Sequence, residues 1–164
     1  MSATESGKIV VGLDRSAGGR RALTWALGEA RRRGAELHVV TAWHWDGIEE
    51  AFLGASNPTE AREAAEQHQR EALDETLSDV GQELPPIVPQ VLRGDSADVL
   101  VHAGQDAELL VVASHGRRAR QRRAPLGSVS ARVVQHATCP VVVVPVPHDE
   151  RGKDTARTAE HSRR

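Results

Sequence analysis

Four short runs of the sequence consist almost entirely of β-branched and aliphatic residues, and they limit the possible folds more than any other feature. Runs that are apolar at every position, instead of every second one, are typical of strands buried on both faces, as in a parallel sheet covered by helices. A fifth and weaker run contains Pro89, which favours an edge strand. In chain order the five runs are KIVVGLD (residues 8–14), ELHVVTAW (36–43), PIVPQVLRG (86–94), AELLVVAS (107–114) and CPVVVVPV (139–146).

Segments with helical periodicity lie between these runs. Ser16 is a suitable N-cap for the first helix, and Asp95 or Ser96 is expected to cap a shorter one. The last helix is expected to begin at Ser128. The alternation of strands and helices predicts one doubly wound α/β domain over residues 1–146, with helices on both faces of the sheet. One side of the last helix is expected to hold Val129, Val133 and His136.

Length, charge and cysteine content exclude several classes of protein. The chain has 164 residues, and its 21 basic and 23 acidic side chains nearly cancel, so the protein as a whole is not expected to bind polyanions. A single cysteine, Cys139, excludes an intramolecular disulfide and a multi-cysteine zinc site. Neither a signal pattern nor a membrane-length apolar run is recognisable, so a cytoplasmic protein is expected. The polar residues 147–164 are predicted to be disordered.

Small residues follow three of the predicted strands, at the sheet edge where ligands bind in open parallel sheets. Residues without bulky side chains let backbone amides approach a phosphate closely. A helix that opens at Gly127, Ser128 and Val129 adds unpaired N–H groups and the positive end of its dipole. Together these features predict a nucleotide or phosphate cradle built from two separate loops. The residues at the strand ends are Gly12, Leu13, Asp14, Ala42, Ala113, Ser114, His115 and Gly116.

A tract with five arginines and no acid, residues 117–123, lies between the two loops. Three interpretations stay open. The tract is a solvated loop, as charge runs usually are, or a positive lid whose guanidinium groups pair with phosphate, or a surface for an acidic partner. Only three Trp, one Phe and no Tyr are available for base stacking, which argues against binding of single-stranded nucleic acid.

From about residue 8 to residue 146, the chain resembles the universal stress protein family. The resemblance rests on VVGLDRSAGGRRALTWA, RGDSADVLVHAGQDAELLVVASHGR and LGSVSARVVQHATCPVVVVP. The ATP-binding branch of that family has the pattern glycine, two residues, glycine, nine residues, then glycine and serine or threonine. Gly116, Gly127 and Ser128 match it. The chain departs from it in two ways: Ala113 replaces the first glycine, and ten residues, 117–126, replace the nine.

The resemblance implies a Rossmann-like five-stranded sheet with strand order 3-2-1-4-5 and a site for ATP, carried with Mg²⁺. It implies that Asp14 lies near the adenine and ribose, and that the backbone of Ala42 meets the adenine edge. Gly116 and the loop that begins at Arg117 match the ribose and phosphate contacts. The phosphate turn is matched by Gly127, Ser128 and Val129.

The first functional hypothesis is a nucleotide-dependent regulator of the stress response, which acts on an unidentified protein partner. It forms a homodimer through the last strand, residues 139–146, because an apolar edge strand invites pairing. The alternative is an interaction module of the same fold that does not bind nucleotide and uses the arginine tract of residues 117–123. A third hypothesis, slow ATP hydrolysis, rests on analogy of fold alone.

No catalytic residue and no metal ligand are assigned. Ser114 and His115 are adjacent, so in extended chain their side chains point to opposite faces, and no orienting acid is evident. Neither a Gly-Lys-Ser/Thr phosphate loop nor a Gly-x-Gly-x-x-Gly turn occurs after a strand, and without the loop lysine fast hydrolysis is not expected.

Overall fold

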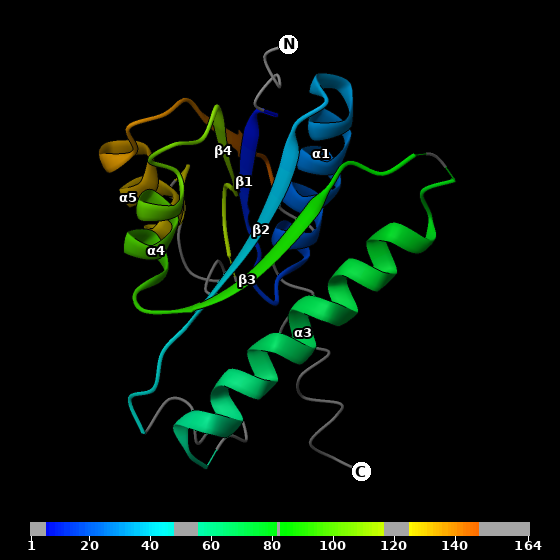
Figure 1. The fold of residues 1–164 in the computed structure, drawn as a ribbon. Helices are drawn as coiled ribbons and strands as arrows, with labels where there is room; N and C mark the ends of the chain where they lie inside the picture. Colours follow the sequence, from blue (N-terminus) through cyan, green and yellow to red (C-terminus); the bar gives the residue numbers. More distant parts are fainter. Residues whose placement is uncertain (1–5, 48–55, 82, 117–124, 148–164) are drawn as a thin grey trace.

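The computed structural model describes residues 6–47, 56–81, 83–116 and 125–147, which form a parallel sheet between two layers of helices (Figure 1). The five strands are arranged in the order β3-β2-β1-β4-β5, and every neighbouring pair is parallel. This confirms the predicted fold class and strand order. The strands are β1 (Lys8–Gly12), β2 (Glu36–Trp43), β3 (Ile87–Arg93), β4 (Leu109–Ala113) and β5 (Val141–Val144).

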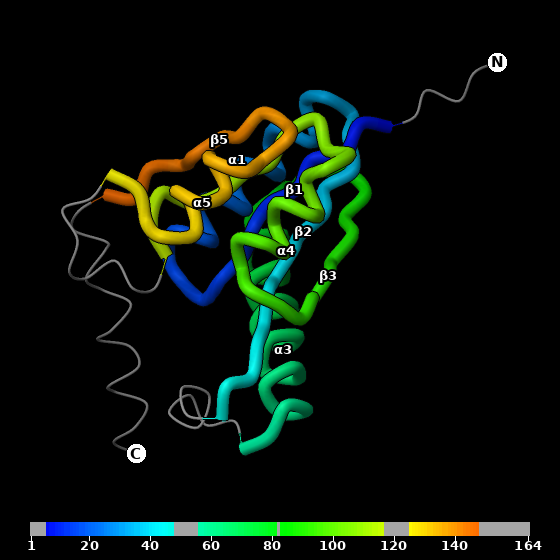
Figure 2. The backbone as a smooth tube through the Cα atoms, turned by 90° about the vertical axis from the view of Figure 1, so that its left-hand side faces the viewer, coloured from blue at the N-terminus to red at the C-terminus, as the bar shows by residue number. Residues whose placement is uncertain are grey.

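The helices α1 (Ala17–Arg33) and α3 (Pro58–Ser78) cover one face of the sheet, and α4 (Ser96–Ala103) and α5 (Ser128–His136) cover the other (Figure 2). Each face has its own apolar core. Successive strand residues alternate between the two cores, so that Ile9 and Val11 pack toward α1 while Val10 packs toward α4. Both cores are apolar, which is why the strands are continuous hydrophobic runs in the sequence.

The sequence signals at the start of α1 and α4 are confirmed. The Ser16 side chain caps α1 by accepting a hydrogen bond from the Gly19 amide at 3.0 Å. Asp95, not Ser96, is the N-cap of α4, and its carboxylate accepts from the amides of Ala97 and Asp98. These caps satisfy first-turn N–H groups that have no partner inside a helix.

Two elements near the carboxyl terminus differ from the prediction. β5 spans only four residues. The prediction that Val129, Val133 and His136 form one side of the last helix is wrong for two of these three residues. Val133 is fully buried, whereas Val129 is 37% exposed and His136 is exposed. The buried residues of α5 are Ser130 and Val133, and this nine-residue helix packs mainly against α4 and β5. Pro89 lies in β3, which is an edge strand as predicted.

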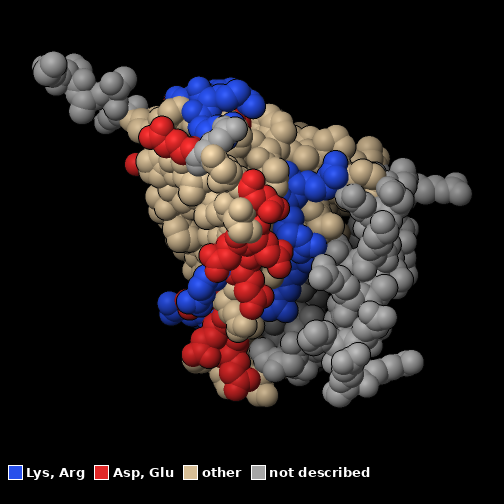
Figure 3. Space-filling model, turned by 90° about the vertical axis from the view of Figure 1, so that its right-hand side faces the viewer, with Lys and Arg blue, Asp and Glu red and all other residues tan. Residues whose placement is uncertain are grey.

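The long helix α3 buries small side chains and one amide most deeply, while Leu73 and Leu77 pack partly buried against the core. Its buried residues are Ala61, Ala65, Gln69 and Ala72. Gln69 Nε2 donates to the carbonyls of Val39 and Gln90 at 2.9 Å and to Thr41 Oγ1 at 3.0 Å, which ties α3 to β2 and β3. Acidic side chains run down the side of the molecule on which α3 lies (Figure 3). Within the described ranges, no helix is both long and apolar enough to cross a membrane.

Candidate functional site

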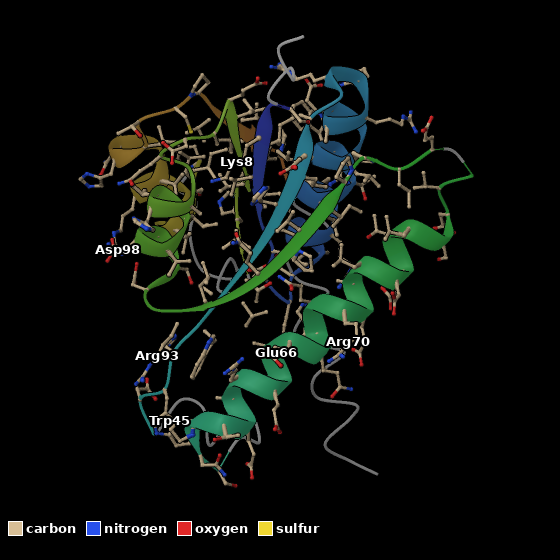
Figure 4. The ribbon with its side chains drawn as sticks, viewed as in Figure 1. Lys8, Trp45, Glu66, Arg70, Arg93 and Asp98 are labelled. Atoms are coloured by element: carbon tan, nitrogen blue, oxygen red, sulfur yellow. The ribbon has the colours of Figure 1, made fainter. Side chains whose placement is uncertain are left out.

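The predicted site residues gather at the carboxyl edge of the sheet. Their loops follow β1 and β4, which are neighbouring strands, and the chain leaves these strands in opposite directions around the sheet. Such a switch point opens a crevice between the two loops. In Figure 4, Lys8 marks the amino end of β1, and Trp45 and Arg93 lie at the opposite, carboxyl end of the strands. Arg93 packs over the Trp43 ring, 5.7 Å from its centroid.

Asp14 forms the corner between β1 and α1. Its Oδ1 accepts from the Ser16 amide at 3.0 Å and from Ser16 Oγ at 2.5 Å, so this oxygen holds the start of α1. The second oxygen points at the β4 loop, where a Cβ built on Gly116 would lie 2.7 Å from Asp14 Oδ2. Only glycine lets the carboxylate approach the backbone this closely. The structure therefore brings Asp14 and Gly116 together.

Ser114 joins the β4 loop to the start of α5. Its carbonyl accepts from the Gly127 amide at 2.7 Å and from Ser130 Oγ at 2.8 Å. Its own amide donates to the Val144 carbonyl at 2.8 Å, and its Oγ accepts from the Val146 amide at 3.0 Å. The two ends of the ten-residue segment are thus fastened together despite its extra residue. Arg117 and the rest of the arginine tract lie outside the described residues.

His115 is buried in the interior of the protein. Its side chain is 2% exposed, and its Nδ1 lies 3.0 Å from Ser114 Oγ. The His115 carbonyl is close to α1, because a Cβ built on Gly18 would lie 2.6 Å from it. The residue as a whole is buried, so neither its ring nor its backbone is open to a ligand from solvent.

The alanine that replaces the first glycine of the family pattern fits the fold. No residue other than glycine has positive φ in the described part of the chain, so Ala113 does not occupy a conformation that requires glycine. Its Cβ would lie 3.1 Å from a Cβ on Gly18, so its methyl group points toward α1. This departure therefore places no side chain in the crevice.

The presence of glycine at position 12 is explained by packing, which the sequence did not reveal. A Cβ at this position would lie 2.8 Å from Leu100 Cδ1, so the glycine lets α4 pack closely against β1. The next residue, Leu13, is buried, and its amide donates to the Val40 carbonyl at 2.9 Å. Ala42 lies half-buried one position before the end of β2, at the same edge of the sheet.

The start of α5 is the one open helix start among those described. The N-caps of α1, α3 and α4 are Ser16, Asn57 and Asp95, and each accepts a hydrogen bond from a first-turn amide. The N-cap of α5 is Gly127, which has no side chain and makes no such bond. Ser128 and Val129 follow it and are exposed. Amides without a partner at a positive helix end favour an anion.

A further residue at this edge, His68 of α3, was not predicted from the sequence. Its Nε2 lies 3.1 Å from the Asp14 carbonyl oxygen, and because a carbonyl only accepts, the imidazole is the donor. Burial lowers the pKa of His68, and the nearby Arg15 and Arg20 act in the same direction, against the effect of the Asp14 hydrogen bond. Its neighbour along the chain, Gln69, holds α3 on the sheet.

Groups of three or more His, Cys, Asp or Glu side chains that would hold a metal ion do not occur in the described ranges. The one cysteine, Cys139, lies half-buried beside the α4 core, and burial raises the pKa of its thiol. A thiol in such surroundings is less reactive than a free cysteine.

These features define a class: a doubly wound α/β domain with an uncapped helix start at the carboxyl edge of its sheet. The model of the universal stress protein family matches residues 5–145, and the chain therefore belongs to that family. A universal stress protein of Mycolicibacterium smegmatis is 35% identical over 138 residues, which are 83% of this chain and 45% of the relative. A universal stress protein of Mycobacterium tuberculosis is 33% identical over 147 residues, 87% of this chain and 48% of the relative. The chain thus spans about half the length of these curated relatives.

Solved structures show the same fold. A universal stress protein in complex with cAMP has a TM-score of 0.63 and 26% identity, covering 88% of this chain and 100% of that one. The universal stress protein of Archaeoglobus fulgidus in complex with dAMP has a TM-score of 0.60 and 23% identity, covering 86% of this chain and 99% of that one. Adenine nucleotides are therefore ligands of proteins with this architecture.

Proposed function

We propose that this chain binds ATP, or another adenine nucleotide, at the carboxyl ends of β1 and β4 and acts as a nucleotide-dependent regulator in the stress response. The observation that carries the proposal is the uncapped start of α5, which lies beside the β4 loop, where a Cβ on Gly127 would be 3.5 Å from His115 Cα. Three other helix starts in the described chain supply their own acceptor. A ligand phosphate is the acceptor that suits the fourth.

Each part of the site has a role in this proposal. The amides that begin at Ser128, with the Ser128 hydroxyl, bind phosphate oxygens. The Asp14 carboxylate accepts from the ribose hydroxyls, and the backbone of Ala42 contacts the adenine edge. Mg²⁺ arrives with the nucleotide phosphates, since the described residues offer no cluster of ligands for it. Because the sequence has no Gly-Lys-Ser/Thr phosphate loop, whose lysine would assist a leaving phosphate, the proposed role is binding and at most slow hydrolysis.

Two variants of one residue test the site. Gly127 has φ −71° and ψ 169°, which any residue adopts, and a Cβ there would meet Ser114 O at 3.4 Å, an ordinary contact. Gly127→Asp supplies a carboxylate that caps the α5 amides and repels phosphate, whereas Gly127→Ala adds only a methyl group. We expect Gly127→Asp to weaken Mg-ATP binding at least about a hundredfold, and Gly127→Ala to change it less than about threefold.

The measurement is calorimetric titration of nucleotide-free protein with Mg-ATP, after anion-exchange analysis of any nucleotide released on denaturation. Equal affinity in wild type and Gly127→Asp would exclude the α5 start as the phosphate site. A protein that releases no nucleotide and gives no heat would favour the alternative, an interaction module that uses the arginine tract.

We further propose that the protein is cytoplasmic and forms a homodimer along the β5 edge, through residues 139–146. β5 lies at one border of the sheet, and Val141, Val142 and Val143 are only partly buried. Apolar edge strands pair with a second copy when nothing else covers them. Sedimentation velocity tests this: Val142→Lys should convert a dimer into a monomer, and a wild-type protein that sediments as a monomer would exclude the proposal.

A further inference from the structure

The contact between α3 and the corner at Asp14 has a different character from the other contacts of α3. The helix is fixed on the sheet by alanines and by Gln69, whose three hydrogen bonds reach β2 and β3. The adjacent His68 makes a separate bond, 54 residues away in sequence, to a single backbone atom of the candidate site. Because Gln69 already holds α3 on the sheet, the His68 hydrogen bond is not needed for that purpose. Its effect falls on Asp14.

Asp14 is half-buried, and residues of α1, α3 and the β4 loop approach it. His68 Nε2 approaches its carbonyl at 3.1 Å from α3, and a Cβ on Gly19 would lie 2.9 Å from the same oxygen on α1. The carboxylate is held at Oδ1 by Ser16 and faces Gly116 at Oδ2. A bond to the carbonyl limits rotation of the Asp14 backbone, and rotation there would swing the carboxylate.

We propose that His68 is a positioning residue of the nucleotide site: by donating to the Asp14 carbonyl from α3, it fixes the direction in which the Asp14 carboxylate meets the ligand. This inference rests on the proposed function for its consequence in binding. The donor is present in both charge states of the imidazole, since Nε2 carries a proton in the neutral tautomer that makes this bond and in the cation. The charged groups that face the ring are those of Asp14, Arg15 and Arg20.

Three variants separate positioning from a general effect on the helix. His68→Leu removes the donor and keeps an apolar body, while His68→Gln keeps an N–H donor on a side chain of similar reach. Ala72→Gly is the matched control, because Ala72 is 2% exposed on the same helix and does not contact Asp14. Glycine there loosens α3 by lowering its helix propensity.

The first measurement needs no ligand. The Ser16 amide donates to Asp14 Oδ1, so its hydrogen-exchange rate reports whether the carboxylate is held in place. We expect this amide to exchange about three- to tenfold faster in His68→Leu, and to return to the wild-type rate in His68→Gln. Ala72→Gly should lower the Tm at least as much as His68→Leu and leave the Ser16 amide unchanged. Unchanged exchange in His68→Leu, or equally fast exchange in all three variants, would overturn the proposal.

The second measurement is calorimetric titration of the same proteins with Mg-ATP. His68→Leu should bind about three- to tenfold more weakly, with recovery in His68→Gln and no change in Ala72→Gly. If wild type binds no nucleotide, the proposed function fails, while the exchange of the Ser16 amide still decides whether His68 positions Asp14. If wild type binds and His68→Leu binds equally well, the positioning role fails and the proposed function stands.

Discussion

Two helices start beside each other at the carboxyl edge of the sheet, and they treat their first amides in opposite ways. At the start of α1, the Gly19 amide donates to Ser16 Oγ, and Ser16 in turn donates to Asp14. At the start of α5, Gly127 offers no side-chain acceptor. One start is closed by residues of the chain itself, and the other is left for an acceptor from outside.

Packing is also tighter around the start of α1 than around the start of α5. A Cβ on Gly18 would lie 2.6 Å from the His115 carbonyl, whereas a Cβ on Gly127 would have no neighbour nearer than 3.4 Å among the described residues. The closed start acts as a rigid corner that fixes Asp14. The open start carries the donors. A ligand site needs both, because donors bind tightly only when the groups around them are already in position.

The same substitution at the two starts should have the largest difference in effect. We expect Gly18→Ala to lower the free energy of unfolding by about 1–3 kcal/mol, since the methyl group overpacks against backbone and Val146. Gly127→Ala should change it by less than about 0.5 kcal/mol. Urea denaturation of both variants provides the test. Equal stability of the two would mean that the closed start relaxes without cost.

Removal of one hydroxyl at each start separates stability from binding. Ser16→Ala removes the cap of α1 and one partner of Asp14, and should cost about 1 kcal/mol of unfolding free energy. Ser128→Ala, at an exposed position of the open start, should leave stability within about 0.5 kcal/mol and weaken Mg-ATP binding about tenfold. Denaturation and calorimetry on the same samples check both. A reversed pattern would contradict the assignment of closed and open starts.

Acid should lower the free energy of unfolding through His68, which contacts the closed start. The pKa of His68 is lowered in the folded protein, chiefly by burial, below its usual value of about 6.5. The unfolded chain therefore binds more protons than the folded one as the pH falls through this range. The stability contributed by neutral His68 is complete above pH 6.5 and is lost as the pH falls through the lowered pKa.

The difference in unfolding free energy between wild type and His68→Gln, measured from pH 8 to pH 5, isolates this effect, because all other titrating groups are common to both proteins. Wild type should lose stability more steeply on acidification. Parallel profiles would show that His68 titrates alike in the folded and unfolded states.

Much of the sheet and of the open start was predictable from the sequence, because the signals are local. A strand buried on both faces is apolar at each position, and Ser16 and Asp95 are side chains that cap the helix immediately after them. The pairing of Asp14 with Gly116 followed from the family pattern. Its physical reason, a carboxylate that approaches the glycine backbone, required coordinates.

The closed corner was largely unpredictable, since its contacts join distant segments. His68 lies in a charged helix and resembles any solvent-facing histidine until the fold places it beside Asp14. Gly12 was expected to admit a ligand, but it admits Leu100 of α4. Val129 and His136 matched the helical period of α5, yet that period does not reveal which side of so short a helix will be covered. The arginine tract lies outside the described residues, and its role stays a prediction.

The smallest expected effect concerns the ion pairs that join α5 to the start of α4. Arg132, one turn after Ser128, pairs through Nη1 with Asp95 and through Nη2 with Asp98, each at 2.8 Å. These groups are roughly half exposed or more, so solvent screens the pairs and Arg132→Ala should cost only about 0.2–1 kcal/mol. The loss should vanish in about 1 M salt.

Arg62→Ala is the matched control for Arg132→Ala, because it removes the same charge from an exposed pair with Glu66 inside α3. If Arg132 orients the open start, its loss weakens Mg-ATP binding up to about threefold while Arg62→Ala leaves binding unchanged. Equal affinities in both variants would show that Ser114 alone, through the Gly127 amide and Ser130, holds α5 against the corner. The open start would then depend on Ser114, the residue that also accepts a hydrogen bond from the Val146 amide just after β5.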